Sequence, residues 1–194
     1  NGNLQCYAAD GSITETVGPN DRRMTGKSFM PKYRGGFSFD LDYKGFFINP
    51  LFSFQLETWK WDNQYSWLMD GSSVNAGYNV SASLLDAWTP TNTTGSLPSV
   101  TAANDADNIA DALSDRHLTD ASFLKLRSLT VGWNLPKKYI GENGFVKSIK
   151  LYVQGENLII WTKWKGYDPE GLFMFPLGRY PNPRTISLGA SIQF

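Results

Sequence analysis

The clearest pattern in the chain is a strict alternation of apolar and polar positions from Arg184 to Phe194. Every second position is apolar, and small or polar residues stand between them. The apolar members are Ile186, Leu188, Ala190, Ile192 and Phe194. A period of two predicts a β-strand with one apolar face, and a tilted strand of about ten residues is long enough to cross a bilayer.

Four further segments show the same period: residues 35–44, 46–57, 122–134 and 147–157. Pro50 interrupts the second of them. Because proline has no N–H to donate to a neighbouring strand, we expect a bulge or a local distortion there. The chain is thus predicted to be all-β, with five antiparallel strands.

The connections between these strands alternate in length. A tight turn at Lys44-Gly45 is followed by a very long connection from Thr58 to Ala121, then a short one from Leu135 to Val146, then a long one from Trp161 to Pro183. Loops in compact domains rarely exceed about 12–15 residues. Short turns on one side and long loops on the other are typical of outer-membrane β-barrels, so we expect the long loops to be extracellular.

The long connections contain weak helical patterns. Residues 81–88 are compatible with one or two helical turns, with Ser81 as the N-cap residue. Residues 105–113 are a second, weaker candidate. The pattern indicates no domain boundary, so residues 1–194 are taken as one portion of a barrel.

Composition narrows the choice of class. Lys and Arg total 18 and so do Asp and Glu, which removes the electrostatic argument for a nucleic-acid partner. No apolar run approaches the about 18 residues of a membrane helix. Aromatic residues make up 14% of the chain, with seven tryptophans. Aromatic enrichment is found both in membrane girdles and in binding clefts, so a soluble carbohydrate-binding β-sandwich stays open as an alternative.

Several motifs then carry a family resemblance. They are Pro31-Lys-Tyr-Arg-Gly-Gly-Phe37, Leu84-Leu-Asp-Ala-Trp-Thr-Pro-Thr-Asn92, the stretch from Asp120 to Pro136, Ile149-Lys-Leu-Tyr-Val-Gln-Gly-Glu-Asn-Leu158, the stretch from Trp161 to Glu170, and Tyr180-Pro-Asn-Pro-Arg184 with the terminal Phe194. In this order they resemble the C-terminal region of the SusC/RagA family of TonB-linked outer-membrane receptors.

The resemblance implies the last five or so strands of a barrel of about 22 strands, whose N-terminal plug and other strands lie outside this sequence. It implies a nutrient importer of oligosaccharides or peptides in the outer membrane, not an enzyme. The expected partners are the rest of the receptor barrel, outer-membrane lipid, a SusD-like surface lipoprotein, and TonB through the absent N-terminal region.

Candidate binding residues lie among the aromatic residues of the long loops: Trp67, Trp88, Trp161, Trp164 and Tyr167. Flat aromatic faces suit sugar rings, peptide side chains or a partner protein, whereas anchoring in lipid headgroups is an equally good reading. In similar outer-membrane proteins the terminal strand is an insertion signal, which here corresponds to Ile186, Leu188, Ile192 and Phe194.

No catalytic or cofactor signature is present. His117 stands alone, without a serine elbow motif, and Asp168 and Glu170 are predicted to belong to a turn at Pro169. The Asp10 to Asp21 segment resembles a calcium loop but lacks the regular Asp spacing of one, so no metal site is predicted.

Overall fold

The structure is a computed structural model that describes residues 2–75, 77–100, 114–141, 144–166, 168–171 and 182–194. The chain forms two compact units. The sheet unit comprises Met30–Thr58, Asp120–Glu170 and Tyr180–Phe194, and the loop unit comprises Asn1–Phe29, Trp59–Thr119 and Gly171–Arg179.

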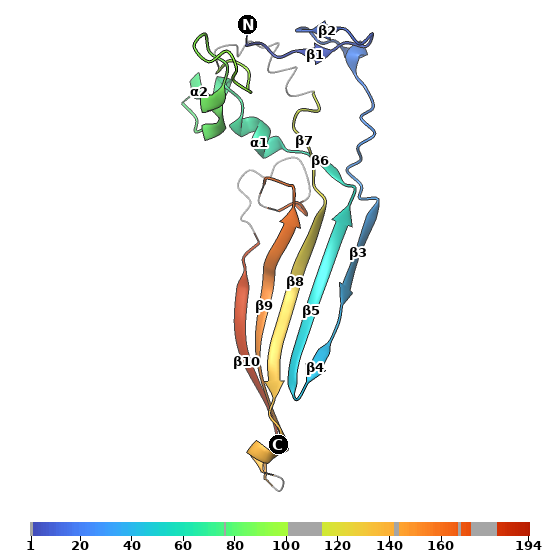
Figure 1. Cartoon of the computed structure of the whole chain (residues 1–194), viewed down its shortest axis with the longest axis vertical. Coiled ribbons are helices and arrows are strands. Elements are labelled where there is room, and N and C mark those ends of the chain that lie inside the picture. Colours follow the sequence, from blue (N-terminus) through green and yellow to red (C-terminus); the bar gives the residue numbers. More distant parts are fainter. Residues whose placement is uncertain (1, 76, 101–113, 142–143, 167, 172–181) are drawn as a thin grey trace. The chain divides into compact units, whose positions relative to one another are not determined.

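The sheet unit is built on one antiparallel sheet of six strands (Figure 1). The strands are β3 (Tyr33–Ser38), β4 (Leu41–Tyr43), β5 (Phe46–Leu56), β8 (Phe123–Asn134), β9 (Ser148–Thr162) and β10 (Thr185–Gln193). Their order is β10-β9-β8-β5-β3, with β4 also paired to β5. The five predicted strand segments are confirmed, since β3 and β4 together fill the first of them.

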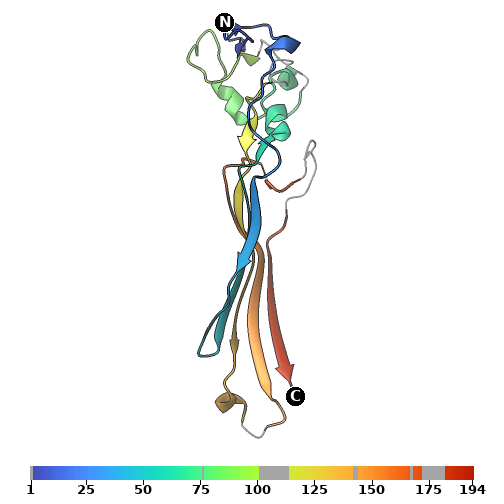
Figure 2. The ribbon, with the colours of Figure 1, turned by 90° about the vertical axis from the view of Figure 1, so that its right-hand side faces the viewer.

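Seen from the side, the strands form a single twisted layer (Figure 2). Among the described residues, β10 at one edge and β3 with β4 at the other pair with one neighbour only. An unpaired edge exposes a row of backbone N–H and C=O groups. The sheet is thus open at both edges, as expected for part of a larger closed sheet.

The irregularity predicted at Pro50 lies beside it, on the partner strand. Pro50 keeps its place in β5, opposite Leu129 of β8. Between Leu126 and Ser128 the register of β8 shifts against both β5 and β9, and Arg127 falls outside both ladders. Such a bulge redirects a side chain that regular pleating would aim elsewhere.

Two glycines, one on β8 and one on the edge strand β10, leave room for aromatic rings of the neighbouring strands. A Cβ atom on Gly132 would come within 2.3 Å of the Phe47 ring, and one on Gly189 within 2.2 Å of the Tyr152 ring. Gly132 stands opposite Phe47, and Gly189 opposite Tyr152, in the strand register. Each aromatic ring therefore occupies space that only a glycine leaves open.

The loop unit contains short elements. They are β1 (Cys6–Tyr7), β2 (Ile13–Thr14), η1 (Pro19–Asp21), β6 (Trp59–Trp61), α1 (Asn63–Leu68), α2 (Ser72–Asn75) and η2 (Ala82–Asp86), with β7 (Leu118–Asp120) pairing with β6. A further helix of the described residues, α4 (Lys137–Ile140), lies in the short connection between β8 and β9. None of the helices in the described residues has the length and hydropathy needed to span a bilayer.

The predicted helical turn near Ser81 is confirmed as the 3-10 helix η2, and the Ser81 hydroxyl accepts the Ser83 N–H at 3.2 Å. The second candidate, residues 105–113, lies outside the described residues. Strand β9 runs on to Thr162, so Trp161 belongs to the sheet and not to the following loop.

Candidate functional site

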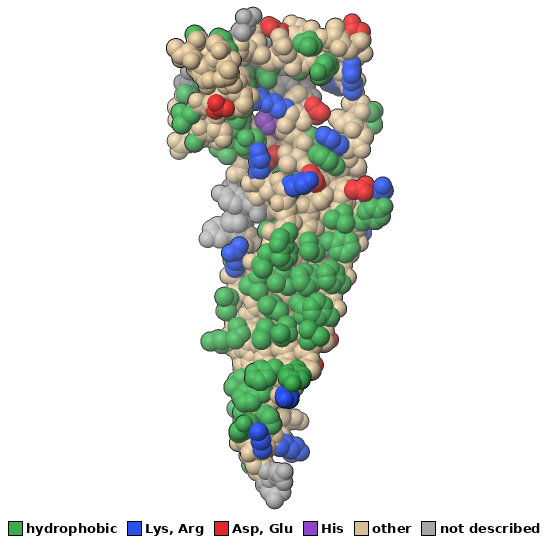
Figure 3. Space-filling view, in the orientation of Figure 1, with side chains coloured by type: hydrophobic (Ala, Val, Ile, Leu, Met, Phe, Trp, Pro, Cys, Tyr) green, Lys and Arg blue, Asp and Glu red, His purple; other side chains and the backbone are tan. Residues whose placement is uncertain are grey.

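One face of the sheet is apolar and exposed. The register places Phe46, Ile48 and Phe52 of β5 opposite Trp133, Val131 and Leu126 of β8, all on this face. The exposed apolar residues on this face are Tyr33, Phe37, Leu41, Tyr43, Phe46, Ile48, Leu56, Val131, Leu151, Val153, Ile159, Trp161, Ile186, Leu188 and Ile192. Figure 3 shows apolar side chains covering the middle of this face.

The exposure on this face is high. Leu188 is 83% exposed, Ile186 71% and Ile192 51%. A contiguous apolar surface of this kind is not left in contact with water by a soluble domain. A β-sandwich would cover this face with a second sheet, and in the described part of the sheet unit all strands belong to the one layer. The sandwich alternative is therefore wrong for this fold.

The other face is polar. Along β5 and β8 it presents Asn49 opposite Thr130 and Ser53 opposite Lys125. Along β9 and β10 it presents Gln154 opposite Ser187 and Glu156 opposite Thr185. Alternation of lipid-facing apolar and lumen-facing polar positions is the pattern of a barrel wall.

A cluster of ion pairs around the buried Lys125 lies on the polar face, near the start of β8. The Lys125 ammonium lies 3.4 Å from Asp168 Oδ2 and 3.2 Å from Glu170 Oε2, and its side chain is only 5% exposed. Arg127, redirected by the bulge, pairs with Glu170 and donates from Nε to Ser53 Oγ at 2.7 Å. The positive charges of Lys125 and Arg127 balance the negative charges of the two carboxylates.

The acidic half of this cluster is a tight turn. Asp168 Oδ1 accepts the Glu170 N–H at 2.9 Å, and Pro169 between them is fully buried. Asn182 donates to Asp168 Oδ2 at 2.5 Å. The turn predicted at Pro169 is confirmed. Sequence reasoning did not select Lys125 and Arg127, which could have been noticed as the two basic residues of this strand.

The terminal strand β10 presents Ile186, Leu188 and Ile192 outward from the sheet. The Phe194 ring lies 5.2 Å from that of Phe145, in the connection that precedes β9. Lys147 N–H donates to Gln193 O at 2.7 Å, which extends the pairing of the last two strands. Ile186, Leu188 and Ile192 of the predicted insertion signal thus lie in an ordered strand with its apolar side outward, and Phe194 follows that strand directly.

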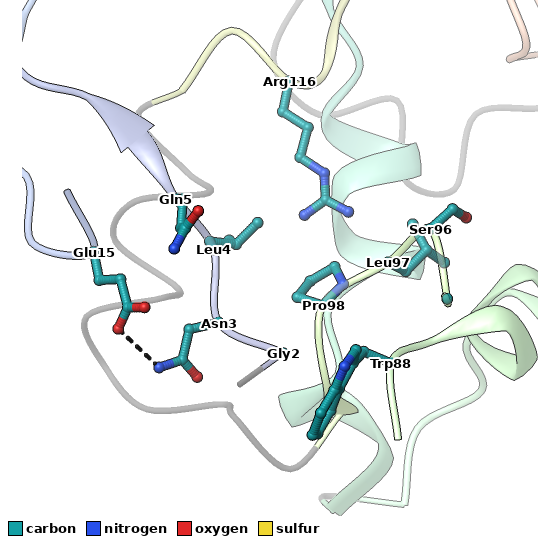
Figure 4. A pocket seen from close by; sticks show the side chains of 11 residues that line it. Gly2, Asn3, Leu4, Gln5, Glu15, Trp88, Ser96, Leu97, Pro98 and Arg116 are labelled. Atoms are coloured by element: carbon teal, nitrogen blue, oxygen red, sulfur yellow. Dashed lines mark hydrogen bonds between the residues drawn. The ribbon is translucent and has the colours of Figure 1, made fainter. Parts of the chain in front are cut away.

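The loop unit contains a cavity of about 560 Å³ (Figure 4). One wall is the segment Gly2 to Gln5 with Glu15, and the other is Gly95 to Pro98 with Trp88 and Arg116. In Figure 4 the Arg116 guanidinium points into the space between these walls. Sequence reasoning selected Trp88 but missed the N-terminal wall, because no periodic pattern links the two.

The candidate tryptophans do not lie together but in four different parts of the structure. Trp67 on α1 is 56% exposed, and Trp88 lines the cavity. Trp161 of β9 stands opposite Leu124 of β8 and is 48% exposed on the apolar face, which favours membrane anchoring for it. The Trp164 ring lies over Gly166, and the Trp164 backbone N–H donates to Thr162 Oγ1 at 3.0 Å. Tyr167 lies outside the described residues.

Packing and hydrogen bonds within the loop unit account for His117 and for the Asp10 to Asp21 segment. His117 is buried, with the rings of Trp61 and Tyr65 edge-on to it at 5.7 and 6.0 Å. Asp21 accepts the N–H groups of Gly18 and Ala9, and these hydrogen bonds lower the pKa of its carboxyl. Within the described residues, no three acidic, histidine or cysteine side chains gather as a metal site would require.

A single antiparallel layer with one exposed apolar face, one polar face and two open edges defines a class: it is part of the wall of a transmembrane β-barrel. No family profile matches the chain. It is 32% identical to TonB-dependent receptor P3 of Formosa agariphila, over 90% of this chain and 17% of that protein. It is 33% identical to TonB-dependent receptor SusC of Bacteroides thetaiotaomicron, over 43% of this chain and 8% of that protein.

Solved structures agree with the sequence comparison. The RagAB peptide transporter matches with a TM-score of 0.82 and 26% identity, over 100% of this chain and 21% of that one. The structure of the RagAB peptide importer in the "open-open" state also matches, with a TM-score of 0.82 and 25% identity. The chain is a segment of a TonB-dependent receptor of the SusC/RagA type. It spans 17% of the length of the curated relatives it first matches, which are named as receptors and not as enzymes.

Proposed function

We propose that the chain forms part of the wall and outer loops of an outer-membrane importer of nutrients, driven by TonB. The observation that carries this proposal is the apolar face of the sheet, exposed on one side of a layer whose other side is polar. In lipid, an open strand edge leaves backbone groups unpaired at a cost of several kcal/mol each. The strands β3, β4 and β10 therefore pair with other strands of the same receptor.

The loops contribute to capture of the nutrient. Trp67 and Trp88 of the loop unit, together with Trp164 and Tyr167 near the end of β9, are proposed to contact the imported ligand or a SusD-like lipoprotein. A solved relative that is named the RagAB peptide importer supports this proposal by analogy. The proposed substrates are oligosaccharides or peptides.

The terminal strand is proposed to guide insertion into the membrane, through the outward side chains of Ile186, Leu188 and Ile192 and the terminal Phe194. Deleting Phe194 from the full-length receptor should lower its amount in the outer membrane, while its synthesis is unchanged. Quantitative immunoblotting of the outer-membrane fraction measures this. A receptor without Phe194 that reaches the membrane in normal amount would refute the insertion role.

The transport role is tested in the host with the full-length receptor. Deleting its gene should abolish growth on at least one nutrient source that the parent strain uses, and a lipoprotein encoded beside it should co-purify with the receptor. Trp67→Ala and Trp88→Ala should reduce uptake or lipoprotein binding with normal assembly. If the gene can be deleted with no change in growth on any oligosaccharide or peptide source, the importer proposal fails.

A further inference from the structure

A row of aromatic rings marks the end of the apolar face at which the short connections lie (Figure 1). Tyr43 of β4 stands opposite Phe46 of β5, and Phe46 stands opposite Trp133 of β8, so all three lie on the apolar face. The rings of Phe46 and Trp133 stack at 5.3 Å, and the Tyr139 ring of α4 meets the Trp133 ring edge-on at 6.0 Å. These four residues are called the aromatic row.

The distance from the aromatic row to the other end of the face matches a bilayer. Trp133 stands opposite Leu151 of β9, and ten residues further along β9 Trp161 is exposed on the same face. A strand rises about 3.3 Å per residue, so ten residues tilted by about 40° rise about 25 Å along the barrel axis. The apolar band of an outer-membrane barrel is about 25 Å tall, with aromatic residues at both interfaces. Because short turns are periplasmic, the aromatic row lies at the inner boundary of the membrane.

Two lysines lie against the aromatic row. The Lys44 ammonium is 5.1 Å from the centre of the Tyr43 ring, and the Lys138 ammonium is 4.7 Å from that of Tyr139. Both lysines are exposed, and neither forms an ion pair with an acidic residue of the described part of the chain. Figure 3 shows Lys and Arg side chains beside apolar ones at this end of the face. Each ring thus holds a cation next to the apolar surface.

The charge of the two short connections is predominantly basic. Besides Lys44 and Lys138, they contain Lys137 and Lys147, which are also exposed. The acidic residue of these connections is Glu142, which lies outside the described residues. Four lysines against one carboxylate give this end of the sheet a positive field, which attracts anions.

The acidic residues next to the Lys44 turn belong to the polar face. Asp42 stands opposite Phe47, whose ring lies on the polar side of β5. Asp40 accepts a hydrogen bond from Asn49, which is also on that side. Side chains of a strand alternate between the two faces, so these carboxylates do not neutralise the lysine beside Tyr43.

A lipid headgroup matches this combination of groups. Acyl chains cover an apolar face, aromatic rings lie at the level of the headgroups, and ammonium N–H groups donate to phosphate oxygens. Lysines at a membrane surface attract anionic lipids, whereas the ammonium of a zwitterionic lipid is repelled by them. A soluble acidic protein would match the lysines but would leave Tyr43 and Phe46, which are 71% and 56% exposed, without an apolar partner.

We propose that Lys44 and Lys138, together with the aromatic row, bind the phosphate of an anionic phospholipid in the inner leaflet of the outer membrane. This inference rests on the proposed importer function, which places the sheet in that membrane, and it names the lipid partner at the inner boundary.

The test uses the full-length receptor, purified in detergent and titrated with phosphatidylglycerol or with phosphatidylethanolamine. Native mass spectrometry measures the lipid bound, and the parent should bind phosphatidylglycerol more tightly. Lys44→Gln and Lys138→Gln should each weaken phosphatidylglycerol binding about fivefold, and the double variant about 25-fold, as expected of lysines near an anionic lipid surface. A double variant with Lys44→Arg and Lys138→Arg keeps both charges and should bind as the parent does.

The matched control is Lys150→Gln. Lys150 is an exposed lysine at the same end of the sheet, but it stands on the polar face, with its ammonium 4.2 Å from the centre of the Phe47 ring. Its substitution should leave phosphatidylglycerol binding unchanged. Since all the substituted lysines are exposed, the variants should assemble as the parent does, and their thermal unfolding temperature checks this.

Three results would overturn the proposal. The parent binds the two lipids equally well, the double glutamine variant binds phosphatidylglycerol as tightly as Lys150→Gln does, or soluble polyglutamate binds with the same dependence on Lys44 and Lys138. The last result would assign the surface to an acidic protein. Growth assays separate this inference from the importer function, because a receptor that supports growth on its nutrient but fails these lipid tests loses only the lipid site.

Discussion

The buried ion pairs of Lys125 allow a quantitative test of what holds the turn after β9 on the polar face. Lys125→Met removes the ammonium but keeps an apolar chain of similar length. Asp168 and Glu170 then lose a cation at 3.4 and 3.2 Å, although Glu170 keeps its pairing with Arg127. The substitution should therefore loosen the turn without changing the sheet.

The magnitude follows from burial. Breaking a fully buried pair by removing one partner costs roughly 3–5 kcal/mol, whereas an exposed pair contributes about 0–1 kcal/mol. The Lys125 side chain is 5% exposed, but Asp168 and Glu170 are 17% and 23% exposed and regain some hydration. We therefore expect a loss of about 2 kcal/mol in the free energy of local opening, between these two limits.

The measurement is native-state hydrogen exchange of the full-length receptor in detergent, read at the Glu170 amide. This N–H donates to Asp168 Oδ1, so its exchange reports opening of the turn. A loss of about 2 kcal/mol corresponds to exchange about 30-fold faster. Since the chemistry of exchange itself depends on pH, parent and variant are compared at one pH.

A matched control is available on the same unit. Lys163 lies 3.9 Å from Asp120, with a side chain that is 84% exposed. Lys163→Met should change the exchange rate at Glu170 by less than about threefold, as expected of a surface pair. If Lys125→Met accelerates exchange no more than Lys163→Met does, the buried pairs do not hold the turn and the reasoning is refuted.

Three further predictions concern the wall and the loop unit. Leu188→Lys, on the apolar face, should lower the amount of assembled receptor, since a lysine in the bilayer costs roughly 2–4 kcal/mol at the midplane. Ser187→Lys, on the polar face, should leave that amount unchanged. Equal membrane levels of the two variants would contradict the assignment of faces. Gly132→Val should displace the Phe47 ring, because a Cβ atom would lie 2.3 Å from it, and should lower the thermal unfolding temperature of the receptor; an unchanged temperature would count against this packing. The hydrogen bonds from Ser96 lower the pKa of Asp86. The stability that this carboxylate contributes to the loop is therefore complete above its ordinary pKa of 3.8 and is lost as the pH falls through the lowered pKa. Hydrogen exchange at the Ser96 amide should show this acid step in the parent and lack it in Asp86→Asn.

Local alternation along the chain was enough to predict the strands and their faces. From Ile186 to Ile192 every second side chain is apolar, and a period of two can place those side chains on one face only. The same reasoning assigned Val131 and Trp133 to the apolar side of β8, and the strand order followed because consecutive antiparallel strands tend to pair. The turn at Pro169 and the Ser81 cap were also predicted, since both depend on neighbours in sequence.

The tertiary structure decided what depends on residues distant in sequence. The bulge lies at Arg127, and not at Pro50, and the ladder between β8 and β9 skips Asn157 and Leu158 at the same place. Lys125 meets Glu170 across 45 residues of sequence, and Gly2 meets Trp88 only because hydrogen bonds join the first segment to residues 95–99. Periodicity carries no information on such contacts, since closing a loop between remote segments depends on the packing of the whole unit and not on the pattern of either segment.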